Sequence, residues 1–543
     1  MKKLAVLILS VFSVAVIFSA CGNTDPEGNA TDSAVSTEAS QQSSALSGTQ
    51  IALSDSGITV NSSPASSDTS EAVYIANDIV YYESGHDLTY GEGGESDAHS
   101  PQNAKEHAVV HITKPGEYIL SGKLSKGQVA VDLGDGAKEN PEAVVTLVFN
   151  NANITCEVAP AVIFYNVYEC SSKDADTAVN NPDTSAAGAN VIIADNSENT
   201  VTGSYVARIY KPGTVVLNSS GTEVEDAEKL HKYDGAFYSK MSMNIGAGEL
   251  GNGTLNINAA NEGLDSELHL TVNGGNINIV SGNDGINTNE DNVSVTTVNG
   301  GNVSILVNGQ TGEGDGIDSN GWLVINGGSV FAQACSFSGD AGIDSDMGIH
   351  INGGKVFATG NMLDRISDSK QNFSVFTFNK PQQSGVYTLK NSQNETVAER
   401  EIANSFSYLI ISDENLVQGD YTLWSGETQF QGINTENMGG GKPMGNRGED
   451  MTPPEEFEEG MSMPFRQERP ERPEDIPEGT PPHEKPEGMS RPEMPEGMTF
   501  PEGEIPEGMP RPGGNFDSAA SGSPSTSFSI KNGGNYFSAV EAV

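Results

Sequence analysis

Short runs of β-forming residues, separated by glycine and asparagine, follow one another from about residue 73 of this 543-residue chain. In the run 322–325, Leu323 and Ile325 alternate with Trp322 and Val324, so the first pair is expected to face a core and the second pair to face outward. No amphipathic helix of useful length is visible in this region. The pattern predicts an all-β body.

An internal repeat organises residues 234–360. Its first element is an acidic residue, glycine, an aliphatic residue, Asp or Asn, and Ser or Thr; it begins at Glu262, Asp284 and Asp315, with looser copies at 234–238 and 340–345. Its second element is Asn-Gly-Gly, whose asparagines Asn273, Asn299, Asn326 and Asn352 lie 26, 27 and 26 residues apart. Such short units bury their apolar side only by stacking on one another.

We therefore expect residues 73–366 to form a right-handed parallel β-helix, in which each repeat supplies at least two strands and a sharp turn. Glycine permits a positive φ in that turn, and the asparagine is expected to hydrogen-bond to the next repeat. A β-propeller would require antiparallel blades with a period of about 40 residues, and the leucine consensus of leucine-rich repeats is absent.

The flanking segments differ in composition from the body. Residues 21–72 are rich in Ser, Thr, Ala, Asp and Gly, which predicts a disordered tether. Residues 367–430 leave the repeat but keep β-rich runs, which favours a β cap over the open end of the solenoid. Residues 437–522 are dominated by Pro, Glu, Gly and Met and are expected to be disordered, whereas 523–543 are expected to form a terminal strand that docks on the body.

The N-terminus predicts export. Residues 1–20 combine a charged start with an apolar run that is too short for a comfortable membrane span. The sequence Phe18-Ser-Ala-Cys21 resembles the lipobox of bacterial lipoproteins, which implies cleavage before Cys21 and acylation of its thiol. The protein would then be lipid-anchored on the extracellular face of the bacterial cell membrane. An ordinary signal peptide followed by a chance cysteine is the alternative.

The charge and the cysteines narrow the classes of function. A net charge of −46 disfavours binding to nucleic acid or anionic lipid and favours divalent cations. The cysteines of the mature body, Cys156, Cys170 and Cys335, form no Cys-x-x-Cys pair, which argues against zinc and thioredoxin-like sites. Cys156 and Cys170 could pair in an oxidising compartment, and Cys335 is expected to be buried.

Several stretches resemble a bacterial carbohydrate-binding family of parallel β-helix proteins that bind cellulose-like and pectic polysaccharides. They are residues 115–122, 127–131, 234–240 and 253–257, together with the Asp-Gly-Ile-Asp and Asn-Gly-Gly repeats. The resemblance covers roughly residues 107–426 and the last few residues. It implies a fold similar to that of polysaccharide lyases, bound calcium and a polysaccharide partner, of plant cell-wall type or another glycan. Residues 171–188 form an insertion that is unusual for this family.

The repeat also stacks carboxylates. Matching residues of neighbouring repeats lie ~4.8 Å apart, and two carboxylates at that distance repel by about 3–4 kcal/mol at an effective dielectric constant of ~20. An all-oxygen set of ligands without thiolate or clustered imidazole favours Ca²⁺. The candidate metal ligands are Glu262, Asp265, Asp284, Asp315, Asp318, Asp344 and Asp346. Solvated turn-forming residues are the alternative interpretation.

The same region argues against catalysis. A calcium-dependent lyase needs a base beside the metal, yet residues 241–354 contain thirteen Asp and Glu and no Lys or Arg. The candidate bases near the repeats are Lys240, His269, His350 and Lys355. We expect a calcium-dependent polysaccharide-binding protein without catalysis. A polysaccharide lyase, a glycoside hydrolase with paired carboxylates, and a structural surface or adhesion protein remain alternatives.

Sugar binding predicts exposed aromatic side chains. Trp322 faces outward by parity and is the first candidate for stacking on a sugar ring, and Phe331 and Phe357 are expected to form a neighbouring outward column. Packing of these rings against a neighbouring loop is the alternative. An anionic uronan would bind so acidic a body only through bridging Ca²⁺.

Overall fold

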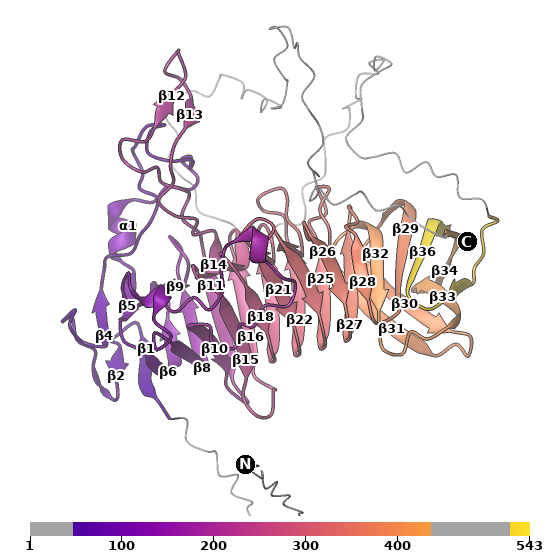
Figure 1. Cartoon of the computed structure of the whole chain (residues 1–543), viewed down its shortest axis with the longest axis horizontal. Coiled ribbons are helices and arrows are strands. Elements are labelled where there is room, and N and C mark those ends of the chain that lie inside the picture. The colour runs from indigo at the N-terminus through magenta and orange to yellow at the C-terminus, as the bar shows by residue number, and fades with distance from the viewer. Residues whose placement is uncertain (1–46, 436–521) are drawn as a thin grey trace, which may run out of the picture. The chain divides into compact units, whose positions relative to one another are not determined.

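The computed structural model describes residues 47–435 and 522–543, and almost all of its regular structure is β-strand (Figure 1). The helical elements within these residues are one five-residue helix, α1 (Pro101–Lys105), and two single turns, η1 (Ala137–Glu139) and η2 (Ala175–Thr177). None of the described helices is long and apolar enough to cross a membrane. The predicted all-β class is confirmed.

Successive repeats stack as columns of parallel strands that belong to two large sheets, one of 26 strands with mixed pairing and one of eight. The first column comprises β1 (Thr49–Ser54), β6 (Gly116–Leu124), β8 (Val145–Thr155), β10 (Ala189–Ile193), β15 (Met243–Ala247), β18 (Leu270–Val272), β21 (Val295–Val298), β24 (Trp322–Ile325), β26 (Gly348–Ile351) and β28 (Ile366–Ser369). The second continues from the end of β8 through β11 (Glu198–Gly203), β16 (Thr254–Ala259), β19 (Asn276–Ser281), β22 (Asn302–Val307), β25 (Ser329–Gln333) and β27 (Lys355–Gly360).

The third column forms the eight-stranded sheet. It comprises β5 (Ala108–Ile112), β7 (Gly127–Asp132), β9 (Val162–Asn166), β14 (Gly235–Ser239), β17 (Glu262–Ser266), β20 (Ile286–Thr288) and β23 (Ile317–Ser319), with β4 (Val73–Ala76) added antiparallel at the edge. Each repeat between residues 235 and 325 therefore supplies one strand to each column. The sequence repeat and the structural repeat coincide.

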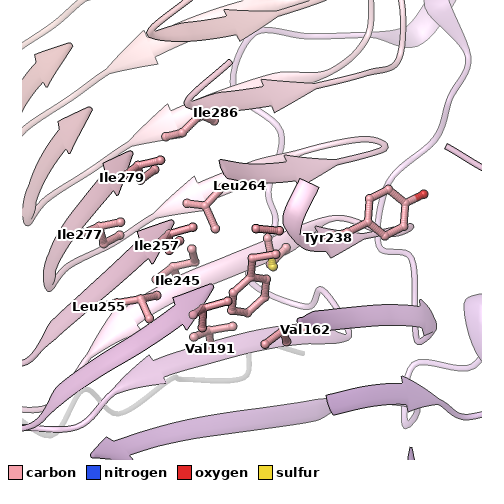
Figure 2. Packing of buried hydrophobic residues seen from close by; sticks show 14 of the residues in the cluster. Val162, Val191, Tyr238, Ile245, Leu255, Ile257, Leu264, Ile277, Ile279 and Ile286 are labelled. Carbon is pink, nitrogen blue, oxygen red and sulfur yellow. The ribbon is translucent and has the colours of Figure 1, made fainter. Parts of the chain in front are cut away.

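Aliphatic side chains fill the space between the columns. Leu255, Ile257, Ile277 and Ile279 from the second column contact Leu264 and Ile286 from the third in one continuous cluster (Figure 2). Leu323 and Ile325 are fully buried, as their parity predicts. The Asn-Gly-Gly turns need their second glycine: Gly301 has a φ of 81°, and a Cβ there would lie 2.5 Å from the carbonyl oxygen of Gly275.

Antiparallel strands end the stack. β32 pairs antiparallel with β27 and begins a second hydrophobic cluster. The strands of this cap are β29 (Phe373–Gln382), β30 (Gly385–Asn391), β31 (Thr396–Ile402), β32 (Phe406–Ser412), β33 (Gly419–Ser425), β34 (Thr428–Thr435), β35 (Phe528–Ile530) and β36 (Gly534–Ala542). β36 pairs in parallel with β29 and antiparallel with β34, and β35 pairs with β33. Phe528 and Phe537 from these strands are buried in the cap.

The expectation of a disordered tether as far as residue 72 is wrong for its last part. β1 pairs in parallel with β6, and Ile51 and Leu53 are buried because they alternate with polar residues along that strand. Two short strands, β2 (Thr59–Val60) and β3 (Ser63–Pro64), follow it. The predicted signal segment 1–20, Cys21, the rest of the tether up to residue 46 and the acidic segment 437–521 lie outside the described residues.

Two excursions leave the columns, one between β4 and β5 and one between β11 and β14. Residues 78–99 and 204–234 meet each other through a bridge between Gly91 and Ile209, and the second excursion contains the hairpin of β12 (Val216–Leu217) and β13 (Val224–Asp226). The second excursion ends at β14, which pairs with β17.

Candidate functional site

A strap of chain lies across the outer side of the first column (Figure 1). We use this name for residues 168–188, which connect β9 to β10 and include the insertion 171–188. The backbone nitrogen of Gly188 donates to the Tyr168 carbonyl at 2.8 Å and closes its base. Beyond the base, Ser242 donates to Glu169 through its backbone nitrogen at 2.7 Å and its hydroxyl at 2.8 Å. The strap is thereby attached to the repeats that follow it in sequence.

Further along, the strap spans several repeats. The hydroxyls of Thr184 and Thr271 lie 2.8 Å apart, and the amide of Asn244 donates to the Thr184 carbonyl at 2.8 Å. Asn180 Nδ2 lies 3.4 Å from His350 Nε2, four strands further along the column than Asn244. The strap thus forms a wall that runs along the column, perpendicular to the strands.

Between the strap and the strands lies a cleft of about 610 Å³. Its floor is a column of outward-facing residues that are in register from strand to strand: Asn244, Thr271, Thr297, Val324, His350 and Asp368. No charged side chain occurs on this floor before His350. Five of these six residues carry hydrogen-bonding groups, spaced by one strand, ~4.8 Å, and Val324 interrupts the row.

A ladder of asparagines borders the floor. Asn299 donates to Asn273 at 2.9 Å, Asn326 donates to Asn299 at 2.9 Å, and Asn352 donates to Asn326 at 2.8 Å. These are the asparagines of the Asn-Gly-Gly turns, so the predicted bond from one repeat to the next exists as a side-chain ladder. Each bond uses one amide hydrogen, and the second hydrogen of each amide is left for a ligand.

Charge collects at one end of the cleft, where Asp368 and Lys370 join His350. Burial lowers the pKa of His350, and the charge of Asp368 opposes that shift. A neutral imidazole offers one donor and one acceptor to a ligand or to Asn180. At the other end, near Asn244 and Thr184, the charged residue that lines the cleft is Asp183 of the strap.

A second candidate site lies on the outer side of the third column, where Tyr238, Asp265, Asn287 and Asp318 are in register. Glu262, Asp284 and Asp315 precede the glycine of each repeat and flank this row. We call these residues, with Asp344 and Asp346 of the next repeat, the acidic column. The structure therefore brings the predicted metal ligands to one face, although they extend over four repeats.

The first end of the acidic column is buried, which argues against the alternative of solvated turn-forming residues there. Asp265 is 0% exposed and Glu262 is 6% exposed. Asn289 donates to Asp265 at 2.5 Å and Asn287 donates to Glu262 at 3.1 Å, which covers one oxygen of each carboxyl group. Asp265 Oδ2, Glu262 Oε2 and Asn287 Oδ1 are buried without a hydrogen-bond partner. A buried acceptor in this state favours a proton or a cation beside it.

Burial and mutual repulsion raise the pKa along the whole acidic column. The pKa values of Glu262 and Asp265 lie well above their usual range, first because of burial and then because of neighbouring carboxylates. Burial raises the pKa of Asp284 to about 7, of Asp315 to about 9, of Asp318 to about 8 and of Asp344 to about 6. The pKa of the exposed Asp346 is also raised. Within residues 47–435 and 522–543, no group of three or more His, Cys, Asp or Glu side chains is arranged to hold a metal ion.

A family model described as "Carbohydrate-binding domain-containing protein" matches residues 106–380, which is 275 of the 543 residues. The chain belongs to this family. No curated protein matches the chain in sequence. A solved structure described as the polysaccharide lyase-like protein from C. thermocellum, gadolinium derivative, aligns with 59% of this chain and 99% of its own at 19% identity and a TM-score of 0.33.

Membership of this carbohydrate-binding family supports a carbohydrate as the general ligand, but the aromatic residues expected to contact it are placed differently. Phe357 is 3% exposed and belongs to the core of the cap, and Phe331 packs against it edge to face at 5.8 Å. Arg400 of β31 lies 5.8 Å from the Phe331 ring. Phe331 and Phe357 do form a column on the outer side of β25 and β27, but the cap covers this side, so the rings pack against the cap. Trp322 is half-buried and does not line the cleft.

Three of the four candidate bases make structural contacts. His269 Nδ1 accepts from the backbone nitrogen of Val295 at 3.0 Å, its Nε2 lies 2.9 Å from Ser171 Oγ of the strap, and burial lowers its pKa to about 4. Lys355 pairs with Asp413 at 3.5 Å. His350 faces the strap, and Lys240 is exposed.

The cysteines play no part in either site. Cys156, Cys170 and Cys335 are free, so the pairing considered for the first two is not formed, and Cys335 is buried as expected. The cleft itself was missed by the sequence analysis. Its signals were the insertion 171–188 and the polar residue two positions before three of the four asparagines of Asn-Gly-Gly, namely Thr271, Thr297 and His350.

Proposed function

We propose that this chain is a polysaccharide-binding protein without catalytic activity that holds a glycan chain in the cleft beneath the strap. The observation that supports this most directly is the cleft floor, where five of six in-register residues carry hydrogen-bonding groups beside a ladder of amides. A polymer of sugars presents hydroxyls at regular intervals, and polar side chains fixed by neighbouring hydrogen bonds bind them with little loss of side-chain entropy.

The proposal includes a right-handed parallel β-helix as the scaffold. Each repeat gives one strand to each of the three columns, and parallel crossovers between strands of one sheet are right-handed in nearly all proteins. A rigid stack of this kind keeps the cleft floor straight over six strands.

The proposal also includes Ca²⁺ at the acidic column, as the family resemblance implies. The unpartnered oxygens of Glu262, Asp265 and Asn287 form an all-oxygen donor set of the type that Ca²⁺ prefers, and Asp284, Asp315, Asp318, Asp344 and Asp346 extend it along the stack. A bound cation would supply the positive charge that keeps these carboxylates ionised. It would stabilise the stack beside the cleft rather than act on a substrate.

We expect no lyase or hydrolase activity. Residues 241–354 contain no Lys or Arg, and His269 and Lys355 are engaged in structural contacts. Attachment to the outer face of the cell membrane through Cys21 belongs to the same proposal and rests on the sequence alone.

Titration calorimetry with a panel of soluble oligosaccharides, neutral and uronate, tests the cleft. We expect Asn299→Ala/Asn326→Ala to weaken binding at least tenfold, because two rungs of the ladder are lost. Asn379→Ala/Asn434→Ala, which removes two exposed cap asparagines, is the matched control and is expected to bind like the unaltered chain. Equal affinity of both double variants, or no binding by the unaltered chain, would contradict the proposal.

A further inference from the structure

The outer face of the second column is almost free of charge, although the protein as a whole is strongly acidic. Strands β11, β16, β19 and β22 present twelve outward positions, and Glu198 at the edge is the one charged residue among them. The other eleven are Thr200, Thr202, Thr254, Asn256, Asn258, Asn276, Asn278, Val280, Asn302, Ser304 and Leu306. We call these eleven residues the neutral face.

The neutral face is regular and accessible. The pairings of β11, β16, β19 and β22 keep one register with no bulge, so the side chains form rows ~4.8 Å apart across the strands and ~6.7 Å apart along them. Asn258, Asn278 and Asn302 are exposed, and Val280 is 37% exposed.

Hydrogen bonds between neighbouring side chains fix the amides in place. Asn302 donates to Asn276 at 2.8 Å, and Asn278 donates to Asn256 at 2.9 Å. As in the cleft, each bond uses one amide hydrogen and leaves the second to face outward. The result is a two-dimensional array of donors and acceptors with Val280 and Leu306 as apolar points along one margin.

The limits of the neutral face are sharp. Lys123 stands in the same row, two strands before Thr200, and at the other end the row continues into Phe331, which the cap covers. A protein with a net charge of −46 keeps this area free of charge, so a charged partner would find no complementary group here. A partner that matches it is uncharged, extended in two dimensions and rich in hydroxyls.

We propose that the neutral face docks on the surface of an ordered, uncharged polysaccharide, in which parallel chains lie side by side and present hydroxyls in a lattice. Rows of Asn, Thr and Ser hydrogen-bond to those hydroxyls, and Val280 and Leu306 contact the C–H faces of the sugars. This deepens the proposed function and rests on it: the cleft takes a single chain, and the neutral face takes the assembled form.

Depletion assays with the full chain test this. The probes are microcrystalline cellulose, crystalline chitin and swollen amorphous cellulose. We expect the unaltered chain to partition onto a crystalline probe and Asn278→Arg, which raises a long charged side chain from the middle of the array, to reduce that partition at least fivefold. Gln393→Arg in the exposed turn of the cap is the matched control and is expected to partition normally. Melting curves of both variants establish that they fold.

The outcomes separate the two proposals. Unchanged partition of Asn278→Arg, or no partition of the unaltered chain onto any crystalline probe, overturns the neutral face as a docking surface. Soluble oligosaccharides should bind Asn278→Arg as they bind the unaltered chain, since the cleft lies on the first column. If oligosaccharide binding is absent while partition onto crystals persists, the cleft proposal fails and the neutral face stands.

Discussion

The acidic column and the neutral face are built from the same repeats, yet stacking has opposite consequences on the two. On the neutral face, Asn302 donates to Asn276 and Asn278 donates to Asn256, so each added repeat satisfies the one before it. On the acidic column, carboxylates of neighbouring repeats have only acceptor oxygens, and Glu262 Oε2 and Asp265 Oδ2 are left without partners.

The difference shows that stacking places the same type of side chain in neighbouring repeats side by side, so the properties of that side chain decide whether the row is stable. An amide is both donor and acceptor, so a row of amides is self-sufficient at any pH. A row of carboxylates requires protons or cations, and its stability therefore depends on the solution. The following experiments test this contrast.

The largest effect is expected from removal of divalent cations. A ligand at a thousandfold excess over its Kd stabilises the folded state by about 4 kcal/mol, which for a body of this size corresponds to a rise in Tm of about 5 °C. We expect a calcium chelator at pH 8 to lower the Tm of the full chain by about this amount in scanning calorimetry, and added Ca²⁺ to restore it. An identical Tm with and without chelator would contradict calcium binding by the acidic column.

The next largest effect is expected from a change of pH, measured as the Tm in the presence of chelator. The folded-state pKa of Asp315 is raised to about 9 and that of Asp318 to about 8, whereas an unfolded Asp has a pKa of about 3.9. The folded state therefore binds more protons between these values, and stability is lost as the pH rises from about 4 through 8 and 9. Melting curves from pH 5 to 9 should show a falling Tm, and saturating Ca²⁺ should flatten the curve. A Tm that rises with pH in chelator would refute the raised pKa values.

Replacing one buried carboxylate by an amide should change the Tm in a direction that depends on whether Ca²⁺ is bound. In chelator at pH 8, Asp265→Asn removes a buried unpartnered oxygen, whose cost is about 1–3 kcal/mol, and is expected to raise the Tm by several degrees. The same variant lacks one ligand for Ca²⁺, so added Ca²⁺ should raise its Tm by less than it raises the Tm of the unaltered chain. Asp226→Asn on the exposed hairpin strand β13 is the control, for which neither condition should matter. A lower Tm of Asp265→Asn in chelator would count against the argument.

The smallest effect is expected from making one rung of the neutral face acidic. Asn302→Asp replaces the donor to Asn276 by an acceptor, at an exposed position where one hydrogen bond contributes about 0.5–1.5 kcal/mol. We expect a Tm lower by a few degrees at pH 7, recovered near pH 3 when the new carboxyl group is protonated. Asn434→Asp, exposed on β34, controls for the added charge. An equal decrease in Tm in both variants would show that the amide row has no special role.

The alternation of apolar and polar residues and the spacing of the repeat predicted the body of this fold, because both are local properties of the chain. Leu323 and Ile325 are buried and the Asn-Gly-Gly asparagines form a ladder, since a stacked repeat converts sequence spacing directly into spatial spacing. The burial of Asp265 could not be predicted in the same way. It depends on amide donors two residues beyond the matching position of the next repeat, such as Asn289.

Contacts between distant segments explain the other failures. Phe357 faces outward from its strand as parity requires, but β32 and the hairpin of β30 and β31, which begin 28 or more residues later in the chain, fold back over it. The strap crosses to Thr271, 87 residues after Thr184, with no periodic signal in its own sequence. Alternation tells which side of a strand a residue occupies and nothing about what later covers that side.

The strap has a fixed length, whereas the columns grow by one strand with each repeat. Duplication of one repeat, for example the residues between Asn299 and Asn326, would lengthen the acidic column, the asparagine ladder and the neutral face together, and β32 would still find the edge of β27 to pair with. The bonds from Glu169 to Ser242 and from Thr184 to Thr271 would survive such an insertion, but Asn180 would no longer reach His350. The strap therefore acts as a ruler: it sets how many repeats the closed cleft spans, independently of how many the chain contains.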